Sequence, residues 1–549
     1  MYNKTLKILT LALSTALISG CGGGSSSDNE EEISSDINLQ IRNDYESIPL
    51  ESASYHINIQ TDHTTNLYLV LTNTNPIDTK DVIINHNAKS INKSYKQLNN
   101  GSKTKDIKNI VPKFITQFNN NIDLSTTKSA SKNNKQLIVD KTNKVVGDSY
   151  TFIVEDDMGN AQYTDTTLRS KVTVDTKFGT KTLLVWVSND SFEDSCTKQK
   201  CITQDMVEEL QEEFLKDGYD NDIYDWVTNI YGEEWGEEAH EKYVNLIPED
   251  NEINILFTDL GEDDNPYGGV MGYFYSKDNF EKTQYPNSNE MIMFYVDSVM
   301  FANDEYDGFW QKEMYSTLAH EFQHMIHFYQ KRVLLDAQDD TWINEMLSET
   351  TEDLIATKID HIGPRGVDPT DGSSGDYDNT NGRYPLFNQY NDISLTEWRN
   401  SLENYSNVNA FGAFLTRNYG GAKVLHDILY NTKEHEDTVE YATGENFGDL
   451  LQQWGEAVVL SSIENPYGLP TYNFGDFKDV SYGNVTYNLG SIDFFKYAPT
   501  PKLYSIDNGN DINIQPHSNK YYLIGQELDG TVDLNISIPT GTKAILISK

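Results

Sequence analysis

Three of the eleven histidines of this chain stand within eight positions of one another, in the stretch STLAHEFQHMIHFYQ at residues 316–330. His320, Glu321 and His324 form the pattern HExxH. Side chains four residues apart lie on the same face of an α-helix, so two imidazoles can reach one metal ion from adjacent turns. The stretch therefore predicts a helix with a metal site on one face. The alternative is a pair of histidines on a solvated helix face.

A third ligand is needed, and His327 is the nearest candidate. A straight helix rises about 1.5 Å per residue, which separates positions 320 and 327 by about 10 Å. Zinc–nitrogen bonds of about 2.1 Å cannot bridge that length, so His327 is rejected.

A second helix, predicted over DDTWINEMLSETTEDLIATKI at residues 339–359, offers acidic side chains instead. Glu345 and Glu349 are four residues apart and share a face. We predict that Glu345 binds the metal ion and that Glu349 accepts a hydrogen bond from a ligand histidine. The alternative is that both glutamates belong to a solvated acidic face.

The order of HEFQH and WINEMLSE resembles the gluzincin metallopeptidases, which include thermolysin and the aminopeptidases. The segments GGVMGYFYSKD, SNEMIMFYVDS, STLAHEFQHMIHF and WINEMLSETTEDL, in that order, are similar to the hyicolysin-type bacterial metallopeptidases. This resemblance extends over about residues 180–465 and, more faintly, over VVGDSYTFIVED.

The resemblance implies a zinc endopeptidase that acts on protein or peptide substrates. It implies His320, His324 and Glu345 as the ligands of one catalytic Zn²⁺ ion and Glu321 as the catalytic base. The residue after the ligand glutamate is usually Gly in such a motif, and here it is Met346. We expect this departure to affect local packing and to leave the ligand set unchanged.

Peptide hydrolysis also needs a donor, besides the metal, for the oxyanion of the tetrahedral intermediate. The resemblance places such a donor near ENYSNVNAFGAFLTRNYGG, where Tyr405 is the predicted residue. His426, Tyr390 and His361 are further candidates.

The pattern of strands and helices predicts an α+β fold in three regions. Short β-prone runs fill residues 37–180. Within them, residues 90–141 are rich in Asn, Lys, Ser and Thr and predict a long loop or a poorly ordered segment. Residues 181–475 show strands first and helices afterwards, and the resemblance makes this a zincin (thermolysin-like) domain. Residues 476–549 predict a second β-rich, sandwich-like domain.

The first residues resemble an export signal. Basic residues precede a short apolar run and then Cys21, in a pattern similar to the lipobox of bacterial lipoproteins. The resemblance implies a signal peptide over residues 1–20, a lipid on Cys21 and a flexible tether over residues 21–36. The alternative is an ordinary signal peptide cut near Gly20. We expect the protein in the cell envelope, anchored by lipid and facing the periplasm or the exterior.

The remaining cysteines, Cys196 and Cys201, predict a small local disulfide in an exported protein. Half of a metal site is the alternative, but no second cysteine pair completes it. The 85 Asp and Glu residues against 42 Lys and Arg argue against binding to nucleic acid. They also argue against attraction to anionic lipid heads, so membrane contact is expected through the lipid alone.

Two functions fit these observations. One is a lipid-anchored zinc endopeptidase, in which zinc activates a water molecule and Glu321 takes its proton. The other is a surface binding or adhesion lipoprotein with an inactive metallopeptidase-like domain. The first is favoured because the predicted base, the three ligands and Glu349 are all present.

Overall fold

A computed structural model describes most of the chain. The described residues are 34–43, 45–86, 111–122, 124, 143–156, 158–248, 251–305, 308–361, 382–464, 467–475, 478–506 and 511–549. The predicted signal peptide, Cys21 and most of the predicted tether lie outside them. The last residues of the predicted flexible tether are not a tether, because strand β1 (Ser34–Ile41) begins at residue 34. Among the described residues, no helix combines the length and apolar character needed to span a membrane.

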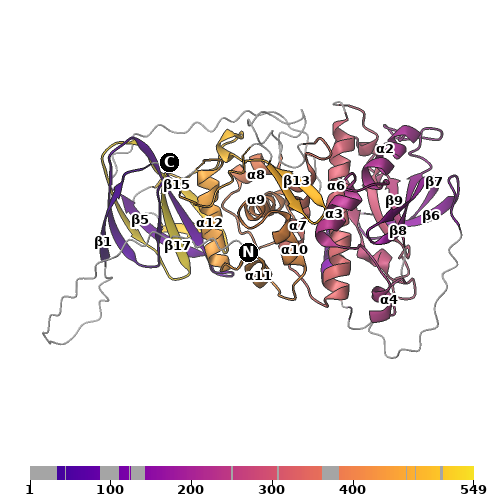
Figure 1. Cartoon of the computed structure of the whole chain (residues 1–549), viewed down its shortest axis with the longest axis horizontal. Helices are drawn as coiled ribbons and strands as arrows, with labels where there is room; N and C mark the ends of the chain where they lie inside the picture. The colour runs from indigo at the N-terminus through magenta and orange to yellow at the C-terminus, as the bar shows by residue number, and fades with distance from the viewer. Residues whose placement is uncertain are drawn as a thin grey trace.

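Two sheets that share one apolar core form a β-sandwich at one end of the molecule (Figure 1). The five-stranded sheet has the order β1, β3 (Ser54–Thr61), β16 (Thr531–Ser537), β5 (Lys80–His86) and β14 (Asp511–Ile514). The four-stranded sheet has the order β15 (Ser518–Leu528), β4 (Thr65–Asn73), β17 (Thr542–Ser548) and β2 (Ser47–Leu50).

The sandwich corrects the predicted separation of residues 37–180 from residues 476–549. Strand β16 pairs with β3 and β5, and β4 lies between β15 and β17, so both ends of the chain build the same two sheets. The physical reason is that strands from either end alone would expose open edges and an uncovered apolar face. Alternation within each strand could not reveal which distant strand would be its neighbour.

A six-stranded sheet lies at the other end of the molecule. Its order is β10 (Gly272–Phe274), β11 (Ile292–Asp297), β9 (Glu252–Thr258), β8 (Gly179–Ser188), β7 (Ala161–Thr176) and β6 (Ser149–Glu155). Strands β8, β9 and β11 run parallel, whereas β10 pairs antiparallel with β11 and forms an edge. Because β6 and β7 belong to this sheet, the predicted domain boundary at residue 180 is corrected to a position before β6.

Helices fill the space between the sandwich and this sheet (Figure 1). The long helix α6 (Phe309–His327) packs against β10 and β11 and continues as a π-helix over Phe328–Leu334. Helix α7 (Thr341–Ile355) packs between α6 and α9 (Leu402–Asn418). Helix α12 (Phe447–Leu460) packs against β4, β15 and β17 and joins the helical part to the sandwich.

The remaining elements surround these. They are α2 (Gln204–Phe214), α3 (Ile223–Tyr231), α4 (Glu238–Lys242), α5 (Ser298–Phe301), α8 (Arg383–Gln389), α10 (Ala422–Leu429), α11 (Asp437–Thr443), β12 (Lys478–Tyr482) and β13 (Val485–Leu489). The predicted disulfide between Cys196 and Cys201 is confirmed. The mixed α+β class is confirmed as well.

One helix stands where the sequence predicted a loop. Helix α1 (Lys113–Asn121) interrupts the predicted loop 90–141, whose remaining residues lie mostly outside the described part of the chain. Phe114, Ile115 and Phe118 recur at helical spacing and pack against the six-stranded sheet. The residues around them are mostly polar, so the short apolar stripe was not recognised as a helix in the sequence.

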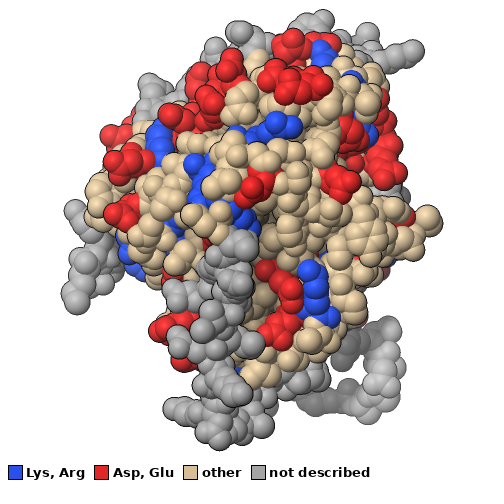
Figure 2. Space-filling model, turned by 90° about the vertical axis from the view of Figure 1, so that its right-hand side faces the viewer, with Lys and Arg blue, Asp and Glu red and all other residues tan. Residues whose placement is uncertain are grey.

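The surface is strongly acidic at the end that carries the six-stranded sheet. Figure 2 shows acidic side chains spread over this face, with lysines and arginines scattered between them. Such a surface favours solubility and attracts positively charged molecules at long range.

The buried side chain of Glu456 on α12 makes stability depend on pH. Burial raises its pKa from 4.5 to about 7. A raised folded-state pKa contributes stability that is complete below pH 4.5 and is lost as the pH rises through 7. The full loss corresponds to about 3 kcal/mol.

We therefore expect Glu456→Gln to remove much of the decline in unfolding free energy between pH 5 and pH 9, measured by urea denaturation. The exposed Glu464→Gln is the control, and equal slopes for the parent and Glu456→Gln would contradict the assignment.

Candidate metal centre

The side chains of HExxH lie on α6 and face α7. The three atoms that converge are Nε2 of His320, Nε2 of His324 and Oε2 of Glu345. Glu345 Oε2 is 3.3 Å from His320 Nε2 and 3.4 Å from His324 Nε2. The three residues offer ligand atoms that all lie within 4.8 Å of one another. Two imidazoles and one carboxylate, with room for a water molecule, form the donor set of a catalytic zinc site.

The hydrogen bonds of the two imidazoles fit this role. His320 Nδ1 lies 2.8 Å from Glu352 Oε1, and His324 Nδ1 lies 3.1 Å from Asn344 Oδ1. Both partners can accept a hydrogen bond from an Nδ1–H group, which leaves the lone pair of each Nε2 directed at the common point. Glu345 Oε2 is buried and has no hydrogen-bond partner among the described residues. An orphaned carboxylate oxygen between two imidazole lone pairs is a site for a cation.

The negative charges of the buried glutamates around the site also favour a cation. Burial acts against a charge on His320, but Glu345 and Glu352 outweigh it and raise the pKa of His320 well above its usual value. Burial likewise opposes the charge on Glu345, yet His324 and His320 lower its pKa to about 2. A divalent cation at the convergence point would satisfy the same carboxylate without a proton on the imidazole.

The prediction for Glu349 is corrected, because Glu352 takes the place beside His320. Glu349 instead accepts hydrogen bonds from Arg383 Nη2 at 2.8 Å and from Asn409 Nδ2 at 3.0 Å. Burial raises the pKa of Glu349, and Arg383 opposes that effect. Glu345, Glu349 and Glu352 share one face of α7, so spacing alone did not distinguish the last two.

A second group of possible ligands, His320, Glu349 and Glu352, also lies close together. Its donor atoms are already engaged. Glu352 also accepts a hydrogen bond from Ser316 Oγ at 2.6 Å, and the guanidinium of Arg383 supplies a positive charge to Glu349. A metal ion there would have to displace the arginine, so the group with Glu345 is the better candidate.

His327 lines the same pocket but is not one of the three residues whose ligand atoms converge. Its Nε2 lies 2.9 Å from Asp339 Oδ2, and Lys331 Nζ lies 3.0 Å from Asp339 Oδ1. Burial lowers the pKa of His327. The side chain is thus bound into a buried network one turn beyond His324.

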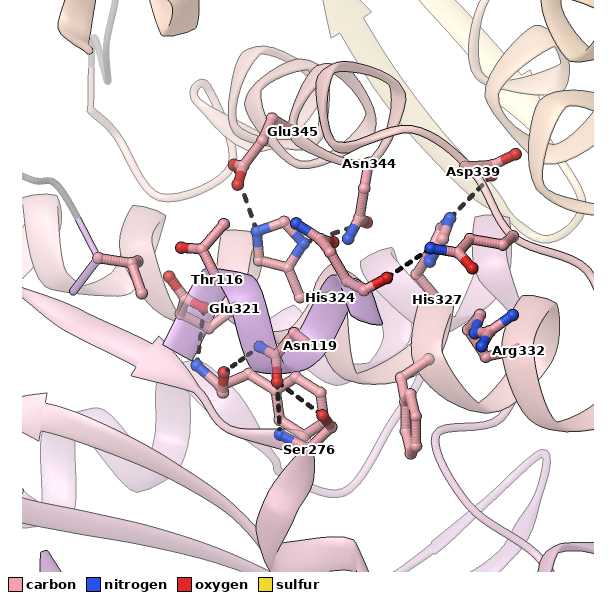
Figure 3. A pocket seen from close by; sticks show the side chains of 15 residues that line it. Thr116, Asn119, Ser276, Glu321, His324, His327, Arg332, Asp339, Asn344 and Glu345 are labelled. Carbon is pink, nitrogen blue, oxygen red and sulfur yellow. Dashed lines mark hydrogen bonds and ion pairs between the residues drawn. The ribbon is translucent and has the colours of Figure 1, made fainter. Parts of the chain in front are cut away.

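Glu321 lies beside the three candidate ligands and is not one of them. Its Oε2 accepts a hydrogen bond of 2.8 Å from the backbone N–H of Phe274 at the end of β10. Burial raises the pKa of Glu321. Figure 3 shows Glu321, His324 and Glu345 around one pocket, whose other side is formed by Thr116 and Asn119 of α1.

Tyr405 lies inside α9, and Arg383 covers its ring at 5.2 Å. Burial raises the pKa of Tyr405 well above its usual value, and the charges of Glu345 and Glu349 add to that effect. The phenol therefore stays protonated next to the carboxylates of the site.

The other predicted donors lie elsewhere. His426 on α10 stacks on Tyr430 with ring centroids 4.5 Å apart, His361 Nε2 lies 2.7 Å from Glu313 Oε2, and Tyr390 is 39% exposed. Neither these three residues nor Tyr405 lines the pocket itself, but Tyr405 is acted on by the charges of Glu345, Glu349 and Glu321. Their residue types suited the role, but sequence distance did not show where the helices would place them.

Close packing of α7 and α9 accommodates Met346. Gly412 of α9 faces α7, where an added Cβ atom would overlap Thr350 Oγ1 and lie 3.2 Å from Met346 Cγ. The side chain that replaces the usual glycine on α7 is thus met by a glycine on the facing helix.

Sequence reasoning missed Asn344, Glu352 and Arg383. Asn344 precedes the ligand Glu345, and Glu352 follows it two turns later, so both could have been considered from helix periodicity. Arg383 follows a segment outside the described residues, and no local pattern indicated it.

Comparison with known proteins identifies relatives of this part of the chain. A family model described as peptidase M30 matches residues 161–446, more than half of the 549 residues. The neutral metalloprotease ShpI of Staphylococcus hyicus is 26% identical over 273 residues. That alignment covers 48% of this chain and 52% of the relative, so the chain spans about half the length of the relative it matches. Both helices of the candidate metal centre fall within the family match, whereas α1 and the sandwich lie outside it.

The ligand set predicts the response of the site to single substitutions. Glu345→Ala should lose zinc, because two histidines alone hold it weakly. Glu352→Ala should keep zinc but bind it roughly 10- to 100-fold less tightly, as expected for a partner of a ligand histidine. His327→Ala should keep zinc at the parent level. The measurement is zinc per protein after dialysis against a graded series of chelator concentrations. Loss of zinc from His327→Ala but not from Glu345→Ala would contradict the site.

Proposed function

The chain belongs to the peptidase M30 family, and on this premise we propose that it is a zinc-dependent endopeptidase that hydrolyses peptide bonds of proteins. The observation that carries the proposal is the convergence of His320 Nε2, His324 Nε2 and Glu345 Oε2 beside the buried carboxylate of Glu321. A metal-binding module without activity would have no need of a buried carboxylate at that position.

Zinc held by the three ligands would polarise the substrate carbonyl and lower the pKa of a water molecule. Glu321 is suited to take the proton of that water. Its Oε2 is fixed by the N–H of Phe274, which orients the carboxylate towards the ligand side of the pocket. Burial raises its pKa, so the carboxylate gains basicity for proton transfer and can then return the proton to the leaving amine.

Strand β10 offers a place for the substrate backbone. It is the edge of the six-stranded sheet, and Phe274 directs its N–H towards Glu321. The C=O of Phe274 lies on the same side of β10, where no further strand pairs with it among the described residues. An extended peptide added along this edge would bring its scissile bond next to the metal ligands.

Tyr405 is our candidate for the donor to the oxyanion. Its phenol is buried among the carboxylates of the site and remains protonated, so it can donate a hydrogen bond and cannot act as a base. Arg383 lies against its ring and holds Glu349, which positions the two side chains together.

Substitution of the base tests the proposed chemistry. Glu321→Gln should keep the parent zinc content and fold but reduce kcat/KM for casein or a peptide substrate by roughly 10²- to 10⁴-fold. Zinc content, circular dichroism and hydrolysis are measured on the same preparation, and the exposed Glu434→Gln serves as the control. If Glu321→Gln retains the parent rate, the chain is not an enzyme of this mechanism.

We also propose that the protein is exported and anchored by lipid at Cys21. The support is the sequence alone: an apolar run that ends in Ile18, Ser19 and Gly20 before the cysteine, followed by a Gly- and Ser-rich segment. An anchored protease of this kind would act on proteins in the cell envelope or outside the cell.

Replacement of the cysteine tests the anchor. In cells that carry out lipoprotein processing, Cys21→Ser should move the protein from the membrane fraction to the soluble fraction. Immunoblotting of the two fractions is the measurement. A Cys21→Ser protein that still sediments with membranes would show that another part of the molecule holds it there.

A further inference from the structure

Helix α1 lies across the pocket of the metal centre. Thr116, Asn119 and Asn120 line that pocket together with Glu321 and the ligands His324 and Glu345 (Figure 3). The helix precedes the family match at residues 161–446 and is far in sequence from the residues it covers. It therefore lies outside the residues that match the family model and still lines the pocket of the candidate metal centre.

The side chain of Asn119 bonds the last residue of the edge strand β10 and the first residue of the 3-10 helix (Ser276–Asn279) that follows it. Its Nδ2 donates to the C=O of Phe274 at 2.8 Å. Its Oδ1 accepts from the N–H of Ser276 at 2.9 Å and from the hydroxyl of Ser276 at 2.6 Å. A carboxamide has the donor and acceptor of a peptide group, so Asn119 takes up the C=O at the end of β10 and the N–H two residues later, where an extended substrate would continue along this edge.

Apolar contacts anchor the same helix to the sheet side of the cleft. The ring of Phe118 lies edge-on to Tyr275 at 5.3 Å and to Tyr285 at 4.9 Å between centroids. Ile115 is fully buried, and Phe114 also packs against Tyr275. These contacts hold the polar face of α1 towards the metal ligands.

Hydrogen bonds also join α1 to the opposite side of the cleft. Asn120 Nδ2 donates to Thr341 Oγ1 at 2.7 Å, at the start of the helix that carries Glu345. Gln338 donates to the C=O of Asn120, and Arg332 donates to the C=O of Ile122. The segment thus bridges both walls of the cleft.

Little room remains for a substrate with α1 in this position. The cavity between α1 and the metal ligands has a volume of about 40 Å³. That is enough for a few water molecules, whereas pockets that hold ligands measure about 300–1,000 Å³. The backbone of α1 is helical, so α1 does not lie along β10 as an extended substrate would.

We propose that α1 is an intramolecular inhibitor, which occupies the substrate-binding edge of the metal centre and must leave it before a polypeptide can bind. This inference rests on the proposed endopeptidase function. Asn119 blocks the edge strand, and Phe118 anchors the helix. Release of α1 would expose the outer side of β10 and open the pocket without moving the metal ligands.

Variants of α1 test the inhibition directly in the full chain. Asn119→Ala and Phe118→Ala should each raise kcat/KM for a short fluorogenic peptide by roughly 10-fold, since each removes contacts of the seated helix only. Zinc content should stay at the parent level. Gln117→Ala, an exposed position of the same helix, should match the parent. Unchanged activity in both variants would overturn the proposal. So would a lower kcat/KM with a raised KM in Asn119→Ala, because α1 would then help to bind substrate.

A binding measurement separates this inference from the proposed function. A labelled peptide with the sequence of residues 111–122 is titrated into the full chain carrying Phe118→Ala, Asn119→Ala and Glu321→Gln. The first two changes weaken the tethered helix, and the third prevents hydrolysis. Fluorescence anisotropy should show saturable binding, and a peptide with alanine at the position of Asn119 should bind more weakly.

The outcomes are distinct. If no variant hydrolyses any peptide but the labelled peptide binds with the expected dependence on Asn119, the proposed enzyme function fails and the occupation of the cleft by α1 stands. If the parent hydrolyses peptides at the rate of the α1 variants and the labelled peptide does not bind, the inhibition fails and the enzyme function stands.

Discussion

Four glutamate side chains are buried around the contact between α6 and α7, and the rest of the site depends on how their charges are satisfied. Glu349 is paired with Arg383, and Glu352 accepts hydrogen bonds from His320 and Ser316. Glu321 accepts from a backbone N–H. Glu345 has one oxygen without a hydrogen bond, directed between two imidazoles. Because a buried carboxylate oxygen without a hydrogen bond is costly, a cation at that point completes the arrangement.

The surrounding fold fixes the position of each of these groups. Helix α6 lies against β10 and β11, which places Glu321 next to the backbone of the edge strand. Helix α9 supports α7 from the other side through the close approach at Gly412. Further away, α12 packs on the β-sandwich that both ends of the chain build together. The sandwich therefore ties the chain ends to the helices behind the metal centre.

The sequence revealed the parts of the site that repeat within one helix. The spacing of His320 and His324 predicted their common face, and the rise of a straight helix excluded His327, which the structure pairs with Asp339. Choices between near neighbours on α7 could not be made from spacing, so Glu349 was assigned the hydrogen bond that Glu352 makes.

Contacts between residues far apart in the chain could not be predicted from sequence patterns. Pairing of β16 with β3 joins residues from opposite ends of the chain, and neither strand carries a local sign of its partner. Helix α1 was predicted as loop because polar residues surround its short apolar stripe. Arg383 reaches Glu349 from a different helix, through packing that no motif encodes.

The account is tested most directly by X-ray absorption spectroscopy at the zinc edge of the purified full chain. The predicted donors are two imidazole nitrogens and oxygen atoms from Glu345 and water, at about 2.0–2.2 Å. The multiple-scattering signal of imidazole rings gives the number of histidine ligands, and this number distinguishes the candidate sites. Two imidazoles support the site of His320, His324 and Glu345. Three imidazoles would include His327, and one would indicate the group of His320, Glu349 and Glu352; either result would contradict the assignment.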